Sequence, residues 1–113
     1  PYILYSYARA NSILKKSKAK ISSKTKNLEQ KEIELMKALS KFPEIIINAY
    51  KSLNPSVIAN YSYHLAQVFN EFYHSCPVLN SENEAFRISL VASFKQVLKN
   101  SFDLLGIEAL EEM

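Results

Sequence analysis

Residues 55–77 read PSVIANYSYHLAQVFNEFYHSCP, and this stretch decides the fold class. Its apolar side chains recur every three or four residues, which places them on one face of an α-helix. Pro55 suits the first turn of a helix and Pro77 cannot continue one, so the pattern predicts a long helix from Pro55 to about Ser75. The apolar stripe consists of Val57, Tyr61, Leu65, Val68 and Phe72.

The same periodicity recurs on both sides of this stretch. Asn27 can cap a helix, with Gln30 in the capping-box position, and the Phe42-Pro43 pair ends that helix and starts another. Gly106 is the residue expected just after a final helix. The predicted helices are residues 2–17, one starting after Asn27, residues 44–53, residues 55–75, and one running from the polar turn at 80–83 to Gly106.

Composition agrees with a helical bundle. The chain of 113 residues is 48% hydrophobic, enough for one core, and it contains a single Gly. Sandwiches and barrels need many Gly-marked turns, so they are disfavoured. No apolar run approaches the roughly 20 residues of a membrane span, and no signal peptide opens the chain. We therefore predict one all-α domain over residues 1–113, a bundle of about five helices in an intracellular protein with no membrane partner.

The titratable side chains offer little for catalysis or metal binding. His64 and His74 lie ten residues apart on one predicted helix, a rise of about 15 Å, so one metal ion could not bind both. Cys76 is the only cysteine, and we expect a buried structural thiol there. The acidic group between Glu29 and Glu34 is expected to be a solvated helix face. We predict no catalytic residue, no metal and no cofactor in these residues.

Positive charge gathers at the start of the chain. Residues 1–28 carry seven Lys and Arg side chains and no acid, whereas the whole chain has a net charge of only +3. Such a block suits a polyanion, because each neutralised phosphate releases counterions. The alternative is a solvated Lys-rich linker between two helices.

Aromatic residues are the second sign of a binding surface. The chain has seven Tyr and six Phe. Tyr2 and Tyr5 share a helix face, as do Phe69 and Tyr73, and Asn70 lies between the latter pair. Aromatic faces that stack unpaired bases, beside lysines that hold phosphates, are typical of proteins that bind single-stranded RNA loops. The alternative is that these rings fill the core.

Three blocks make the sequence recognisable. Residues 2–14, YILYSYARANSIL, resemble the family pattern YVQYAHARICSI. Residues 65–79, LAQVFNEFYHSCPVL, resemble LAxxFNxFYxxCPVL. Residues 87–100, RISLVASFKQVLKN, are followed by LLGI at 104–107 and a terminal Met113. Together they resemble the C-terminal anticodon-binding domain of arginyl-tRNA synthetases, over the whole chain and in order. The sequence departs from the pattern at Leu4, Tyr7 and Asn11.

The resemblance implies a function for the chain and for a larger parent. It implies an all-α bundle that binds the anticodon stem-loop of arginine tRNA. The parent would be a cytoplasmic, monomeric enzyme that joins arginine to that tRNA with ATP and Mg²⁺. Its catalytic domain would precede this chain, so the fragment alone should bind RNA and not catalyse.

The resemblance also assigns roles to residues. The base pocket would be formed by Tyr2, Tyr5, Phe69, Asn70 and Tyr73, and Met113 would close it. Candidates for contacts to the RNA backbone are Arg9, Lys15, Lys16 and Lys18, with the rest of the lysine block up to Lys26.

Two other interpretations stay open at the level of sequence. One is a related helical anticodon-binding domain of another class I synthetase, such as the cysteinyl enzyme. The other is a helical protein–protein adaptor, in which the aromatic rings are core and the lysine block is a linker.

Overall fold

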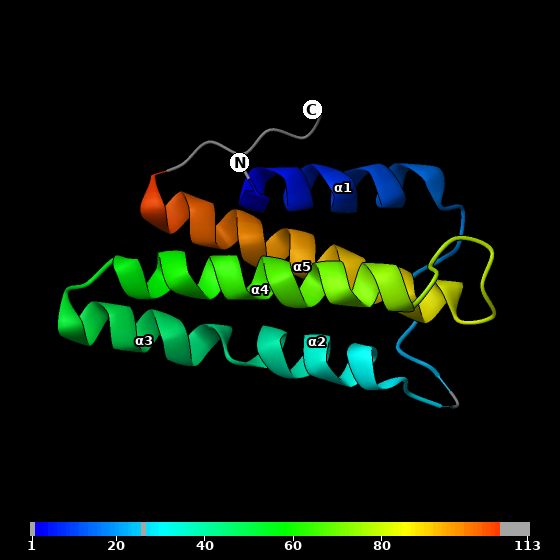
Figure 1. Cartoon of the computed structure of the whole chain (residues 1–113), viewed down its shortest axis with the longest axis horizontal. Coiled ribbons are helices and arrows are strands. Elements are labelled where there is room, and N and C mark those ends of the chain that lie inside the picture. The colour runs from blue at the N-terminus through cyan, green and yellow to red at the C-terminus, as the bar shows by residue number, and fades with distance from the viewer. Residues whose placement is uncertain (1, 26, 107–113) are drawn as a thin grey trace.

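The chain folds into helices joined by short connections (Figure 1). The structure is a computed structural model that describes residues 2–25 and 27–106. Over these ranges it contains five helices and no β-strand, which confirms the predicted all-α class. None of these helices combines the length and the apolar character needed to cross a membrane. The helices are α1 (Tyr2–Lys16), α2 (Gln30–Ser40), α3 (Phe42–Ser52), α4 (Ser56–Ser75) and α5 (Glu84–Leu105).

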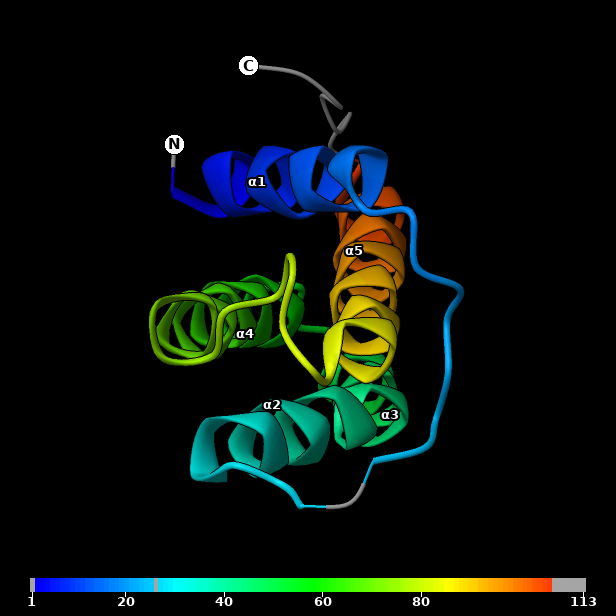
Figure 2. The same ribbon diagram turned by 90° about the vertical axis from the view of Figure 1, so that its right-hand side faces the viewer.

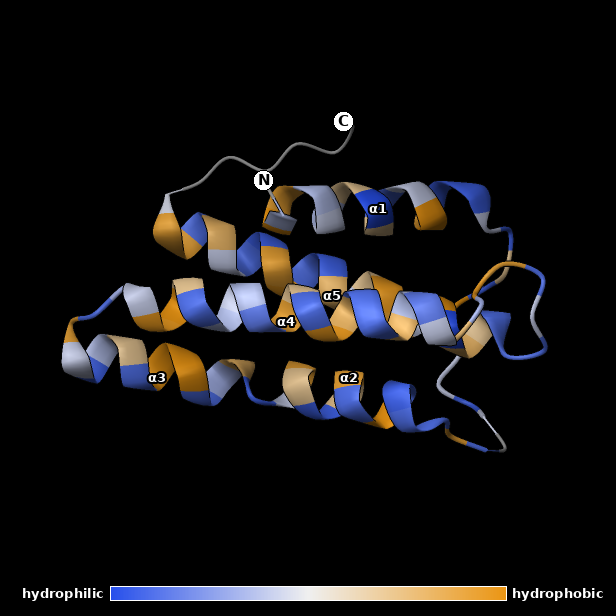
Figure 3. Ribbon diagram, in the orientation of Figure 1, coloured by the Kyte–Doolittle hydropathy of each residue, from blue (hydrophilic) through white to orange (hydrophobic). Residues whose placement is uncertain are grey.

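The two longest helices, α4 and α5, form the centre of the molecule (Figures 1 and 2). On one side α1 lies over both of them, and on the other side lie α2 and α3. Each helix is amphipathic, so orange and blue residues alternate along the ribbons in Figure 3. The consequence for function is that α1 and α4, which are far apart in sequence, share a seam on the surface.

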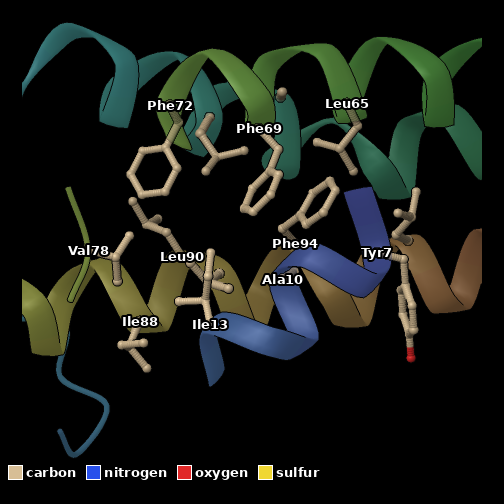
Figure 4. Close-up of a cluster of buried hydrophobic side chains, with 14 of the residues drawn as sticks. Tyr7, Ala10, Ile13, Leu65, Phe69, Phe72, Val78, Ile88, Leu90 and Phe94 are labelled. Atoms are coloured by element: carbon tan, nitrogen blue, oxygen red, sulfur yellow. The ribbon is translucent and has the colours of Figure 1, made fainter. Parts of the chain in front are cut away.

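The core is built mainly from aromatic and leucine side chains of α4 and α5 (Figure 4). The rings of Phe69 and Phe94 are nearly parallel, with centroids 4.0 Å apart. Tyr7 of α1 packs against Phe102 of α5, with ring centroids 6.0 Å apart. The predicted apolar stripe of α4 is confirmed at Tyr61, Leu65 and Phe72, which are buried. Val57 and Val68 are only partly buried, and Ile58 and Phe69 complete the buried face.

One helix end confirms the sequence prediction and two correct it. Gly106 follows α5 with a left-handed φ of 73°, a conformation that glycine adopts without strain. The helix predicted from Pro55 begins one residue later, at Ser56, whose backbone N–H and hydroxyl donate hydrogen bonds to Oδ1 of Asn54 at 3.1 and 2.6 Å. The predicted Asn27 cap is wrong: α2 begins later, after Glu29, whose backbone N–H donates to the carboxylate of Glu32 at 2.7 Å. A Glu–Glu capping box therefore replaces the expected one.

The predicted solvated acidic face is wrong for one of its members. Glu32 is fully buried, and its carboxylate accepts a hydrogen bond from Nε of Arg87 at 3.0 Å. Nη1 of Arg87 donates to the carbonyl of Pro77 at 2.6 Å. A buried charge needs such a partner, because leaving it unpaired away from water is costly. The ion pair thus joins α2, α5 and the loop after α4.

Candidate nucleic-acid interface

Two adjoining hollows follow the seam between α1 and α4. The larger has a volume of about 870 Å³ and is bounded on one side by residues 77–79 of the loop after α4. The smaller, of about 620 Å³, reaches Tyr2 and Asn70. Both are lined by Tyr5, Arg9 and His74. We call this combined surface the α1–α4 groove.

Arg9 lies at the middle of the groove between two tyrosine rings. Its guanidinium carbon is 4.3 Å from the ring centroid of Tyr73 on α4 and 5.1 Å from that of Tyr5 on α1. A planar cation over aromatic faces is attracted by their electron density. Tyr5 and Arg9 meet because residues four apart share a helix face. The result is an exposed layer of flat groups, two aromatic and one cationic.

Asn70 lies beneath this layer and uses its amide within the protein. Its Oδ1 accepts a hydrogen bond from Nη1 of Arg9 at 2.9 Å. Its Nδ2 donates to the hydroxyl oxygen of Tyr2 at 2.7 Å and to Oγ of Ser6 at 2.9 Å. The Asn70 side chain therefore links three positions of α1 to α4.

Positive charge borders the larger hollow. Lys15 and Lys16, in the last turn of α1, are exposed and line it beside Arg9. Lys18 is exposed but lies beyond the end of α1 and lines neither hollow. Lys26 falls outside the described residues. The groove thus brings together Arg9, Lys15 and Lys16, three of the residues predicted to contact the RNA backbone. Lys18 lies apart from them.

Phe69 corrects the predicted base pocket. It is completely buried and stacks on Phe94, so it cannot stack on a base from the groove. The reason is helical geometry, since Leu65, Phe69 and Phe72 fall on one face and that face meets α5. Met113, predicted to close the pocket, lies outside the described residues. The other predicted base-contacting residues, Tyr2, Tyr5, Asn70 and Tyr73, all line the groove.

Two further aromatic side chains lie at or near the groove: His74 lines both hollows, and Tyr63 packs on Tyr2 but lines neither. The ring of Tyr63 lies 5.4 Å from that of Tyr2, centroid to centroid, and both rings are partly exposed. His74 meets Tyr73 edge to face with centroids 5.3 Å apart. The spacing of Tyr63, Asn70 and His74 at seven and four residues places them on one stripe of α4. This spacing in the sequence is the signal from which the stripe could have been predicted.

Two kinds of side chain bear on catalysis and metal binding: the Cys76 thiol and the residue types that could bind a metal ion. Cys76 is buried, and burial raises the pKa of its thiol, as expected of a structural cysteine. Across the described ranges, no three His, Cys, Asp or Glu side chains gather as metal ligands would. The chemistry that the groove offers is stacking, cation–π contact and charge, all of which suit a flat base joined to a phosphate.

Comparison with known proteins agrees with this description. Residues 3–113 match the family described as "DALR anticodon binding domain". The chain is 44% identical to the arginine–tRNA ligase of Thermococcus sibiricus and 41% identical to that of Clostridium beijerinckii. Both alignments cover all of this chain but 19% and 21% of those proteins.

Solved structures give the same result. Arginyl-tRNA synthetase of Thermus thermophilus superposes with a TM-score of 0.94 at 34% identity, covering 100% of this chain and 21% of that one. The Plasmodium falciparum enzyme superposes with a TM-score of 0.84 at 34% identity, covering 99% of this chain and 21% of that one. The chain therefore spans about a fifth of the length of these relatives. They are arginine enzymes, so the cysteinyl alternative is not favoured. The match over residues 3–113 identifies the chain as a member of the DALR anticodon-binding domain family.

Proposed function

We propose that this chain is the part of an arginine–tRNA ligase that binds the anticodon stem-loop of arginine tRNA. The observation that carries the proposal is the layer formed by Tyr5, Arg9 and Tyr73 in the α1–α4 groove. Unpaired anticodon bases offer π-faces to such a layer, and each base stacked on an aromatic side chain contributes about 1–3 kcal/mol.

The charge around the groove supports an RNA ligand over an apolar one. Lys15 and Lys16 line the larger hollow and would contact the phosphates that flank a stacked base. Phosphate contacts set the register and orientation of the RNA but carry no sequence information. Selectivity must therefore come from base edges. Every arginine codon has G in the middle, so every arginine anticodon has C as its second base, and that base is the one a common site can recognise.

The reaction belongs to the rest of the parent protein in this proposal. The relatives that share this domain are about five times longer, which leaves room for a catalytic domain that uses ATP and Mg²⁺. In this proposal ATP and Mg²⁺ are bound by that other part of the parent protein. The parent would act in the cytoplasm as a monomer.

The C-terminus is the remaining part of the proposed site. Met113 would close the base pocket by apolar contact, as a flexible thioether can pack against a base or a ring. Deleting residues 110–113 should leave the fold intact, because the buried core of the described residues runs from Tyr7 to Phe102. It should weaken binding of the anticodon stem-loop. A deletion variant with unchanged affinity would remove Met113 from the site.

Binding to three RNA stem-loops tests the proposal. The first is an arginine anticodon stem-loop, the second differs from it only at the second anticodon base, and the third carries a cysteine anticodon, which keeps C as its second base. At low salt the protein should bind the first more tightly than the second, which measures recognition of the second base, and more tightly than the third if a further anticodon base is also recognised. Equal binding of all three would mean that the protein binds RNA only as a polyanion, without recognising its sequence. Preference for the third would favour the cysteinyl alternative, and no binding would favour the adaptor.

A further inference from the structure

The hydrogen bonds of Asn70 suggest a role for its amide other than contacting a base. We propose that Asn70 is a positioning residue that holds the guanidinium of Arg9 in place for RNA and does not itself contact a base. The inference rests on the proposed function, because RNA affinity is part of its test. It follows from where each hydrogen-bonding atom of the Asn70 amide is used.

The amide of Asn70 is largely occupied by protein partners. An asparagine amide has two N–H donors and one carbonyl oxygen with two lone pairs. Both donors are used, by Tyr2 and Ser6, and the oxygen accepts from Arg9. Only 9% of Asn70 is exposed. A base that paired with this amide in the bidentate manner would have to displace protein bonds that are already formed.

The partners of Asn70 also fix which way its amide faces. Arg9 has only donors, so the atom that faces it must be the acceptor Oδ1. Ser6 Oγ donates its proton to the carbonyl of Tyr2 at 3.0 Å, so it accepts from Nδ2. With its nitrogen held in this way, the amide presents its oxygen to the guanidinium.

The held guanidinium is suited to bind RNA. Nη1 of Arg9 bonds to Asn70, and arginine has five N–H donors, so one bond leaves most of its donor edge outside this contact. The rings of Tyr5 and Tyr73 contact the guanidinium, and Asn70 holds one of its terminal nitrogens. An arginine that is fixed before binding loses less conformational entropy when RNA arrives. Asn70 thus increases affinity through Arg9.

A double-mutant cycle in the full-length protein that carries this domain tests the inference. RNA affinity is measured for the wild type, Asn70→Ala, Arg9→Met and the double variant with the arginine anticodon stem-loop. Asn70→Ala should weaken binding roughly 3- to 30-fold when Arg9 is present, and by less than about twofold when Arg9 is already methionine. Equal losses in both backgrounds would overturn the inference, because Asn70 would then act without Arg9.

A second measurement reports the position of Arg9 directly. The side-chain NMR signals of Arg9, assigned by their loss in Arg9→Met, should carry ring-current shifts from Tyr5 and Tyr73. These shifts should shrink in Asn70→Ala and persist in Asn70→Asp, which keeps an oxygen facing the guanidinium. Unchanged Arg9 signals in Asn70→Ala would contradict the positioning role.

Ser62→Ala is the matched control. Ser62 is buried in the same helix and donates a hydrogen bond to the carbonyl of Ile58 at 2.9 Å, away from the groove. Its loss should lower stability without changing the Arg9 signals or the RNA affinity per folded molecule. If the wild type itself failed to bind the arginine stem-loop, the proposed function would fail together with this inference. Binding with additive losses would overturn the inference alone.

Discussion

Phe69 of α4 and Phe94 of α5 stack face to face, with ring planes 2° apart and centroids separated by 4.0 Å. Both are fully buried at the middle of the interface between the two longest helices (Figure 4). Only four residues along α4, Tyr73 is 37% exposed and packs against Arg9 in the groove. Two neighbouring aromatic residues of one helix therefore have separate tasks, one in stability and one in binding.

Phe69→Ala should destabilise the fold without touching the RNA surface. Truncating a fully buried phenylalanine typically costs about 3–5 kcal/mol, because apolar contacts are lost and a cavity remains. Urea unfolding measures this loss, and RNA affinity is then compared per folded molecule. If Phe69→Ala kept its stability but lost much of its RNA affinity, Phe69 would belong to the base pocket after all.

Tyr73→Ala should have the opposite profile. RNA affinity should fall by about 1–3 kcal/mol through the loss of one stacking face. Stability should fall less than in Phe69→Ala or Phe72→Ala, since Tyr73 is partly exposed. Titration with the arginine anticodon stem-loop and urea unfolding separate the two effects. A Tyr73→Ala protein that unfolds readily but binds normally when folded would place Tyr73 in the core.

Removing only the cation of the buried Glu32–Arg87 ion pair should lower the free energy of unfolding more than replacing both side chains by apolar ones. Arg87→Met leaves the carboxylate of Glu32 buried without its cation. Such a loss typically costs about 3–5 kcal/mol. The double variant Glu32→Leu, Arg87→Met should be less destabilised than Arg87→Met alone, because no unpaired charge remains. Unfolding by denaturant measures both, and additive losses would show that the two side chains act independently.

Salt should weaken RNA binding steeply. If about three to five phosphates are contacted, log K should fall by roughly 2–3.5 per decade of salt, using the single-strand coefficient. Lys15→Ala and Lys16→Ala should each reduce that slope by about 0.7 and weaken all RNA sequences equally. Lys18→Ala is a matched comparison, since Lys18 lies outside the groove. A slope that stays the same in the Lys15 and Lys16 variants would exclude them as phosphate contacts.

The acid side of the stability profile should depend on Glu84. Hydrogen bonds from the Ser17 hydroxyl, and then from the Asn80 backbone N–H, hold the pKa of this carboxyl below its ordinary value of 4.5. A lowered folded-state pKa adds stability above the unfolded value, and this stability is lost as the pH falls through the folded value. The stability advantage of the wild type over Glu84→Gln should therefore be full near pH 6 and shrink below about 4.5. Urea unfolding across pH 3–7 measures it, and an advantage independent of pH would contradict this assignment.

Periodicity predicted the helices because the apolar stripes are long and regular. The stripe that includes Leu65 and Phe72 is the buried face of α4, and Gly106 ends α5 as its lack of a side chain suggests. The resemblance predicts Phe69 in the base pocket, but Phe69 lies between Leu65 and Phe72 on the buried face of α4. Its spacing from those two residues favours the core.

Local sequence patterns do not predict contacts between residues that lie far apart in the chain. Glu32 and Arg87 are 55 positions apart, and one buried acid among several exposed ones has the same local sequence as a solvated face. The Glu29–Glu32 spacing did offer a capping-box signal for the start of α2. The sequence predicts that the amide of Asn70 contacts a base. Its hydrogen bonds with Arg9 and Tyr2 depend on how α1 packs on α4, which local sequence does not specify.

The packing of α1 has a consequence for the order in which a ribosome could produce a working groove. α1 precedes the other helices in the chain, yet it packs on α4 and α5, where Tyr7 contacts Phe102 and where Ala10 and Ile13 join the same core. During synthesis α1 is therefore made before both of its partners. A nascent chain that ends before Phe102 lacks part of the surface that seats α1, so the groove can be completed only after α5 has been translated.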